Sequence, residues 1–110
     1  MNIDELVKES YETAKSKGWH DGPPGDVAVK LCLIHSEVSE ALEQYRDGHP
    51  LDHTYYDCNG KPEGFMSEIA DVVIRIADLC GRYDLDLEAA LKEKMAFNKK
   101  RSFRHGNKVC

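Results

Sequence analysis

The sequence lacks the features that mark membrane, secreted and zinc-ribbon proteins. No apolar run approaches the roughly 20 residues of a membrane span, and the first twelve residues are polar and acidic, unlike a signal peptide. The four cysteines are dispersed and form no C-x-x-C pair, which excludes a zinc ribbon or a thioredoxin-type motif. We therefore expect a cytoplasmic protein with reduced thiols and no membrane partner.

Long alternation of apolar and polar residues is also missing, so the sequence predicts no clear strand. Hydrophobic residues make up 41% and charged residues 32% of the chain, a composition typical of a globular protein rather than a disordered or fibrous one. At 110 residues we expect a single domain over residues 1–110, with a tail over 102–110.

Charge is distributed unevenly along the chain. The formal net charge is −5, yet residues 92–108 hold seven of the fifteen Lys and Arg against a single acid, so that this segment carries +6 and the remainder −11. An acidic body with a short basic segment lacks the broad basic face that nucleic-acid polymers require, and we exclude that class of partner. The balance suits a small anionic ligand held between local positive charges and a bound cation.

Hydrophobic periodicity predicts four helices. They cover residues 4–17, about 26–46, about 65–83 and about 86–100, with Asp26 and Asp86 as N-caps of the second and fourth. A glycine- and proline-rich loop over 18–25 and a polar stretch over 47–64 are the longer connections. We expect an all-α, four-helix bundle-like domain in which the second and third helices pack antiparallel.

Apolar seams at alternating steps of four and three residues run along the two central helices. In the second helix the seam consists of Val27, Leu31, Ile34, Val38, Ala41 and Tyr45; in the third it consists of Phe65, Ile69, Val72, Ile76, Leu79 and Tyr83. The third helix is apolar nearly all round, because Ala70, Ile74 and Ala77 lie opposite its seam. Such a helix needs cover on two sides, so the sequence predicts an obligate homo-oligomer.

Both central helices carry the same acidic pattern. Glu37 and Glu40 flank the seam of the second helix, and Glu68 and Asp71 occupy the matching positions 31 residues later. Acids at i and i+3 present their oxygens to one spot, and antiparallel packing brings the two pairs together at the edge of the core. Carboxylates about 5 Å apart repel by roughly 3 kcal/mol per pair at an effective dielectric of about 20, so four of them require a cation. An all-carboxylate site favours Mg²⁺, with Mn²⁺ as the alternative ion.

Other interpretations of these residues stay open. Acidic pairs at this spacing are common on solvated helix faces, and they also suit a non-catalytic helical interaction module whose acidic face binds a basic partner. Trp19, the single tryptophan, either stacks on a base or caps the core. A di-iron bundle is set aside because it places Glu-x-x-His on two helices, where this chain has Glu40 and Asp71.

A zinc site in the polar stretch is a further alternative. Its ligands would come from four residues with suitable spacing, although an ordinary polar loop is the commoner outcome: His49, His53, Asp57 and Cys58.

Glu37-x-x-Glu40, a spacer of 27 residues and Glu68-x-x-Asp71 together resemble the ExxE…ExxD signature of the MazG-like group of all-α nucleoside triphosphate pyrophosphohydrolases. The Gly18-Trp19-His20 end of the first helix and the basic ending from Lys94 to Gly106 extend the resemblance over most of the chain. The resemblance implies hydrolysis of an NTP or dNTP between the α- and β-phosphates to the monophosphate and pyrophosphate, with Mg²⁺, in nucleotide-pool cleaning. It also implies a homodimer or homotetramer, and this chain looks like the compact single-domain form.

Roles for individual residues follow from the same resemblance. Glu37, Glu40, Glu68 and Asp71 would be the metal ligands and catalytic residues, with one of them orienting or deprotonating the attacking water. Lys94, Asn98 and Arg101 match the phosphate and sugar contacts of the family. Further substrate contacts are expected from Trp19 and His20, and Arg104 either touches phosphate or solubilises the tail.

Overall fold

The computed structural model describes residues 1–22 and 26–101. Most of these residues lie in four helices: α1 (Ile3–Ser16), α2 (Val27–Arg46), α3 (Phe65–Arg82) and α4 (Leu87–Lys100). The predicted mostly helical fold is confirmed, and each predicted helix boundary falls within one residue of the observed one. Within the described ranges no helix combines the length and the apolar character needed to cross a bilayer. The predicted tail over 102–110 lies outside the described residues.

A short antiparallel hairpin between α2 and α3 was not predicted. Its strands, β1 (Tyr55–Tyr56) and β2 (Pro62–Glu63), contain two residues each, which is too short for alternation to show in the sequence. Asp57 closes the turn, because its Oδ1 accepts hydrogen bonds from the backbone N–H groups of Asn59 and Lys61 at 2.8 and 2.9 Å. Gly64 then adopts φ 123°, and a Cβ there would lie 2.5 Å from the His53 carbonyl oxygen, so the chain turns tightly into α3.

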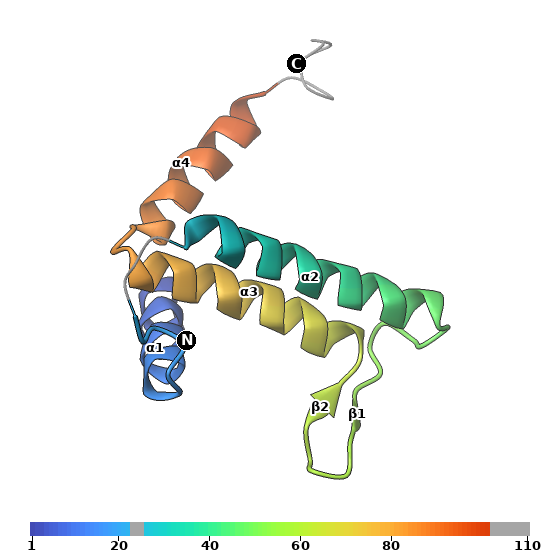
Figure 1. Cartoon of the computed structure of the whole chain (residues 1–110). Coiled ribbons are helices and arrows are strands. Elements are labelled where there is room, and N and C mark those ends of the chain that lie inside the picture. Colours follow the sequence, from blue (N-terminus) through green and yellow to red (C-terminus); the bar gives the residue numbers. More distant parts are fainter. Residues whose placement is uncertain (23–25, 102–110) are drawn as a thin grey trace.

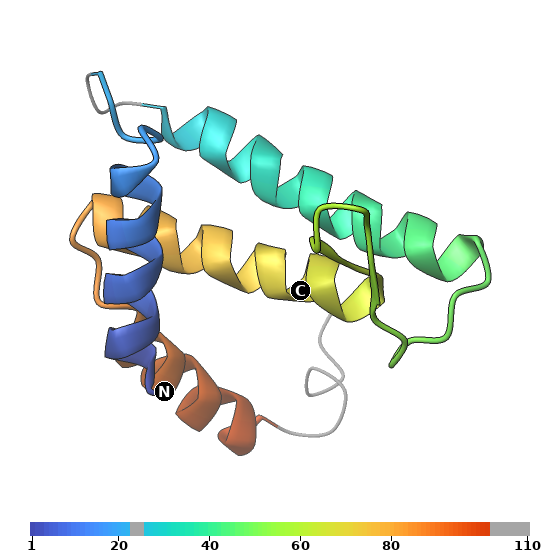
Figure 2. The same cartoon turned by 90° about the horizontal axis from the view of Figure 1, so that it is seen from below.

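α2 and α3 lie side by side and run in opposite directions (Figure 1). α1 packs across α3 near the C-terminal end of that helix (Figure 2). The crossing is close at Gly81, where an added Cβ would lie 2.5 Å from the Cβ of Tyr11 and 3.3 Å from the Val7 carbonyl oxygen. The absence of a side chain at Gly81 therefore lets the two helices approach each other.

α4 contacts α1 and projects away from the α2–α3 pair (Figure 1), and we call it the α4 arm. Asp86 caps the arm as predicted, since its Oδ1 accepts from the Ala89 backbone N–H at 3.0 Å. Asp26 occupies the N-cap position of α2, but its side chain makes no capping hydrogen bond. No residue of the α4 arm is buried.

The predicted apolar seam of α2 is only partly buried in the structure. Among the described residues, the buried hydrophobic side chains are Ala41, Ala77 and Cys80. Most of the predicted α2 seam is exposed, with exposed fractions of 41% for Val27, 47% for Leu31, 51% for Val38 and 61% for Tyr45. Two members of the predicted seam are shielded from solvent, because Ala41 is buried and Ile34 is half-buried. Glu37 is buried together with Ala41, so the inner face of α2 includes an acidic residue as well as seam residues.

Candidate metal centre

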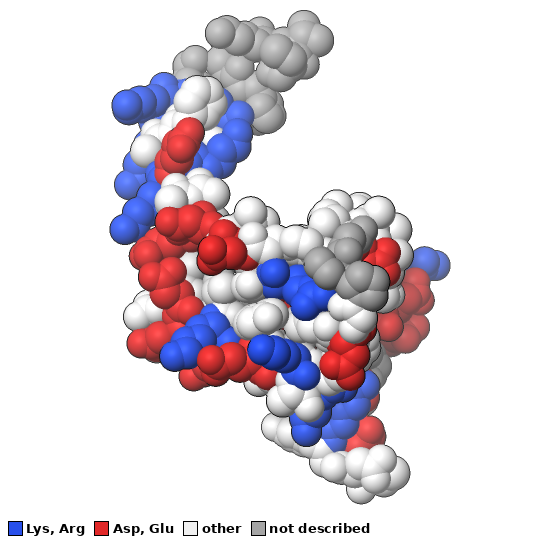
Figure 3. Space-filling model, turned by 60° about the vertical axis from the view of Figure 1, so that its left-hand side comes forward, with Lys and Arg blue, Asp and Glu red and all other residues white. Residues whose placement is uncertain are grey.

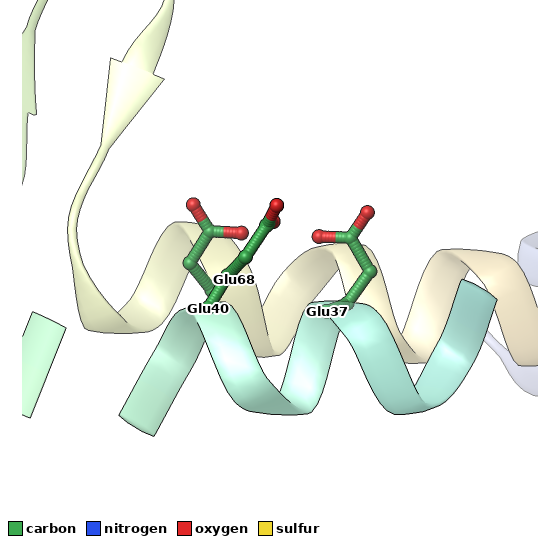
Figure 4. A group of neighbouring side chains, drawn as sticks. All are labelled: Glu37, Glu40 and Glu68. Carbon is green, nitrogen blue, oxygen red and sulfur yellow. The ribbon is translucent and has the colours of Figure 1, made fainter. Parts of the chain in front are cut away.

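Three glutamates from two helices meet at one side of the α2–α3 pair. Glu37 and Glu40 project from α2 and Glu68 from α3, all toward the same side (Figure 4). One carboxylate oxygen of each residue lies within 4.8 Å of the corresponding oxygen of the other two. Glu37 and Glu68 are buried, with 8% and 9% of their surface exposed, and Glu40 is exposed. We call these three residues the acidic cluster.

The surroundings of the acidic cluster shift its ionisation. Burial, followed by hydrogen bonds and charge repulsion from Glu40 and Glu37, raises the pKa of Glu68 from its ordinary 4.5 to about 7. Burial alone would raise the pKa of Glu37 as well, but hydrogen bonds with Glu40 and Arg75 lower it below its ordinary value. Burial and the neighbouring carboxylates therefore favour the protonated form of Glu68 to a higher pH than is usual for a glutamate.

Asp71, the fourth predicted ligand, lies one turn after Glu68 on α3 and is half-buried. It is not among the acids whose oxygens come within 4.8 Å of one another. Burial and then the negative charge of Glu37 raise the pKa of Asp71, so it belongs to the same electrostatic environment. The structure therefore brings three of the four acids together and places the fourth beside them.

Arg75 pairs with the acidic cluster, a role that was not predicted from the sequence. Its Nε donates a hydrogen bond of 2.9 Å to Oε1 of Glu37. Both side chains are largely shielded from water, with 31% of Arg75 and 11% of Glu37 exposed. The available signal was its position four residues after Asp71, which puts it on the same face of α3.

The geometry of the acidic cluster suits a hard divalent cation. Oxygen ligands of Mg²⁺ lie about 2.1 Å from the ion, so two opposite ligands are about 4.2 Å apart. Adjacent ligands of the same ion are about 3 Å apart. The oxygens of the cluster lie within 4.8 Å of one another, so they are near enough to converge on one ion after moving closer together. A dication would also offset the repulsion from Glu37 and Glu40 that, after burial, contributes to the raised pKa of Glu68. The residues present therefore fit Mg²⁺ or Mn²⁺.

A cleft of about 420 Å³ lies between α1, α2 and α3, and Arg75, which pairs with Glu37 of the acidic cluster, is part of its wall. Its lining includes apolar side chains and two residues of the site region: Leu6, Trp19, Leu33, Ile74, Asp71 and Arg75. The guanidinium carbon of Arg75 lies 5.7 Å from the centroid of the Trp19 ring, within the range of a cation–π contact. With 60% of Trp19 exposed, its ring is available to a planar ligand, and the cleft has a volume typical of small-molecule sites.

His20 follows Trp19 and is buried. Only 2% of its side chain is exposed, its Nε2 lies 2.6 Å from Oδ1 of Asp78, and its ring lies 5.2 Å from that of Tyr11. His20 therefore anchors the loop after α1 to α3, next to the cleft. That it contacts substrate stays a prediction.

The predicted phosphate contacts lie on the α4 arm and at its end. Lys94 and Asn98 are exposed on the arm, Arg101 is its C-cap, and Lys and Arg cover much of its surface in Figure 3. The arm projects away from the helix pair that carries the acidic cluster (Figure 1), so one chain does not bring these residues to the cluster. Arg104 lies outside the described residues.

The alternative zinc ligands do not gather into a site. Within residues 26–101, His49, His53, Asp57 and Cys58 form no group with mutual distances suited to a metal ion. The two histidine rings instead stack against Tyr55, at centroid distances of 5.1 and 5.8 Å. The Tyr55 hydroxyl in turn donates to Oε1 of Gln44 on α2 at 3.1 Å, which fixes the hairpin to that helix.

No protein-family model, curated protein or solved structure matches the chain. We therefore interpret the site from its own chemistry: acids that meet between two helices, an arginine that pairs with one of them, and a cleft beside them.

Proposed function

We propose that this protein hydrolyses nucleoside or deoxynucleoside triphosphates between the α- and β-phosphates, giving a nucleoside monophosphate and pyrophosphate, with Mg²⁺ or alternatively Mn²⁺. The observation that carries the proposal is the convergence of Glu37, Glu40 and Glu68 from two antiparallel helices. Burying like charges at one point is costly unless a cation is held there. The triphosphate is inferred from the sequence resemblance and from the cleft beside the cluster. The proposed role is nucleotide-pool cleaning.

The acidic cluster would hold the ion, and Asp71 would complete the site from the side of the cleft. A bound Mg²⁺ supplies neutralisation of phosphate charge and lowers the pKa of water. One of the four carboxylates orients the attacking water and takes its proton. The water oxygen forms a bond to the α-phosphorus, the bond from that phosphorus to the bridging oxygen breaks, and pyrophosphate leaves.

The cleft would receive the base of the nucleotide. The α4 arm of a second copy would contact its phosphates. Trp19 offers an exposed aromatic face on the cleft wall, and base–aromatic stacking is worth about 1–3 kcal/mol where it occurs. Lys94, Asn98 and Arg101 supply two positive charges and an amide for phosphate and sugar oxygens.

We propose that the protein is a homo-oligomer in which a second copy covers α2 and brings its α4 arm to the acidic cluster. Two exposed apolar surfaces support this proposal. Val27, Leu31, Val38, Leu42 and Tyr45 are exposed along α2, and Leu91, Met95 and Phe97 are exposed on the arm. Apolar surface of this extent is typical of an interface between subunits.

The competing hypothesis is a non-catalytic helical module whose acidic face binds a basic partner. Such a module needs exposed acids that long basic side chains can reach. Glu37 and Glu68 are instead buried and directed at one point, and Arg75 of the same chain already pairs with Glu37. These observations favour a small cation over a protein partner.

Thermal unfolding with and without Mg²⁺, and with Mg²⁺ plus a non-hydrolysable dNTP analogue, separates the two functions. We expect the melting temperature to rise with Mg²⁺ and to rise further with the analogue, because both bind the folded state. Pyrophosphate release from a panel of canonical and damaged nucleotides then identifies the substrate. No stabilisation by either ligand, together with a salt-sensitive protein complex, would support the interaction module instead.

A further inference from the structure

We infer that Arg75 is a positioning residue that couples ion binding at the acidic cluster to the aromatic wall of the cleft at Trp19. The inference rests on the proposed function, because it concerns the ion that the acidic cluster would hold. No role for Arg75 was predicted from the sequence.

The coupling starts from contacts that Arg75 makes on two sides. Its Nε donates to Oε1 of Glu37 at 2.9 Å, and its guanidinium carbon lies 5.7 Å from the centroid of the Trp19 ring. Arg75 also lines the cleft together with Trp19 and Asp71. A single side chain thus lies between the acidic cluster and the one tryptophan of the chain.

The contact with Glu37 is of the kind that holds a metal-binding carboxylate in place without itself touching the ion. A carboxylate has two oxygens, so Glu37 can keep Oε1 on Arg75 while Oε2 faces an ion. Hydrogen bonds of this kind fix the orientation of a ligand, and their loss typically weakens metal binding by about 10- to 100-fold. The planar guanidinium suits this role because its N–H groups can donate to a carboxylate while the same group lies over an aromatic ring.

Ion binding would move this chain of contacts. The oxygens of the acidic cluster lie up to 4.8 Å apart and would have to move closer together around Mg²⁺, and Glu37 is one of the side chains that would move. Arg75 follows Glu37 through their hydrogen bond, so its position over Trp19 changes as well. The wall of the cleft therefore responds to occupancy of the acidic cluster before any nucleotide enters.

The fluorescence of Trp19 tests the coupling without nucleotide. Mg²⁺ is titrated into the full chain, and Trp19 emission and the heat of ion binding are followed in parallel. We expect emission to change with the same midpoint as the calorimetric binding curve. In Arg75→Lys the positive charge remains but Nε and the guanidinium plane are lost, so we expect about tenfold weaker Mg²⁺ binding and loss of the emission change.

Arg46→Lys is the matched control, because Arg46 also pairs with a glutamate, Glu43, at 3.2 Å but on the exposed surface of α2. We expect this variant to behave as the unmodified protein in both measurements. Ion binding by the unmodified protein without an emission change would refute the coupling and leave the proposed function intact. Unchanged affinity and emission response in Arg75→Lys would refute it too. The absence of any ion binding would overturn both proposals.

Discussion

Nε2 of His20 lies 2.6 Å from Oδ1 of Asp78, and this contact joins the loop after α1 to the middle helix of the fold. An ionised carboxylate only accepts hydrogen bonds, so the ring nitrogen donates. Asp78 lies three residues after Arg75 on α3, and His20 directly follows Trp19. The position of the cleft wall and the position of the arginine that pairs with Glu37 are therefore fixed by the same helix.

The first prediction concerns this anchor. Asp78→Ala should lower the free energy of unfolding by about 1–3 kcal/mol, because it leaves the buried ring of His20 without its partner. Urea unfolding followed by circular dichroism measures the change. Asp21→Ala removes an exposed carboxylate from the same loop and should change the stability by less than about 0.5 kcal/mol. Equal effects of the two substitutions would show that the His20–Asp78 hydrogen bond does not stabilise the loop.

The second prediction is a pH dependence of stability without divalent ions. The pKa of Glu68 is about 7 in the folded protein, above its ordinary 4.5, and burial also raises the pKa of Asp71. A raised pKa means that the folded protein keeps a proton that the unfolded chain has released. The proton held by Glu68 therefore stabilises the folded protein fully below about pH 4.5, and this stabilisation is lost as the pH rises through 7. The melting temperature in a chelator should therefore fall between those values.

Glu68→Gln removes the titrating group and should flatten this part of the pH profile, whereas Glu43→Gln on the exposed face of α2 should keep it. Mg²⁺ should counteract the loss at high pH, because the ion binds the deprotonated carboxylates. A melting temperature that rises from pH 5 to 8 in the chelator would contradict the raised pKa of Glu68.

The third prediction concerns catalysis by the acids. Glu40→Gln and Asp71→Asn should each lower pyrophosphate release by about 100-fold or more, because each removes a charge that the proposed ion requires. Circular dichroism and the sedimentation coefficient should stay unchanged, since Glu40 is exposed and Asp71 only half-buried. Glu43→Gln, one turn further along α2, should retain full activity. Near-normal turnover in either of the first two variants would exclude the site.

The fourth prediction separates the two roles of Trp19. Base stacking worth about 1–3 kcal/mol implies that Trp19→Ala raises KM by about 5- to 150-fold, while Trp19→Phe keeps most of the affinity. Steady-state kinetics at saturating Mg²⁺ measures both variants. A Trp19 that caps the core would give a different result: Trp19→Ala would lower the stability and leave KM unchanged.

The fifth prediction tests whether the α4 arm acts on the acidic cluster of a second copy. Glu40→Gln and Lys94→Ala should each be nearly inactive alone, but a refolded mixture should regain activity, because mixed oligomers contain sites with neither substitution. Random pairing into dimers restores about a quarter of the original activity. If the arm served its own chain, every site would carry one substitution and the mixture would stay inactive.

The interface itself is tested by Leu42→Glu, which places a charge on the exposed apolar surface of α2. This substitution should shift the sedimentation coefficient toward that of the monomer.

The helices could be predicted from the sequence because their apolar residues recur at helical spacing and several of their ends carry local signals. Asp86 is an effective cap in the structure, and the turn at Asp47 and Gly48 ends α2 as expected. The faces of α2 could not be assigned in the same way. Four of the six predicted seam residues are exposed, whereas Ala41 of the seam is buried together with Glu37, whose carboxylate pairs with Arg75 from another helix.

The acids of the site were visible in the sequence because the spacing in one helix repeats in the other. Their convergence depends on the register between α2 and α3, which the repeat alone does not determine. The contacts of Arg75 and Asp78 could not be predicted from the sequence, because their partners, Glu37 and His20, lie 38 and 58 residues away. Contacts at such separations are set by the packing of helices and leave no local pattern.

The crossing at Gly81 has a consequence for how this protein can vary. A single added methyl group there would collide with Tyr11 and act as a wedge between α1 and α3. A displacement of α1 would also change the position of Trp19, which follows that helix, relative to Arg75 on α3, although no acid is substituted. A substitution at Gly81 would therefore change the shape of the cleft, and with it the proposed activity, from a position outside the acidic cluster.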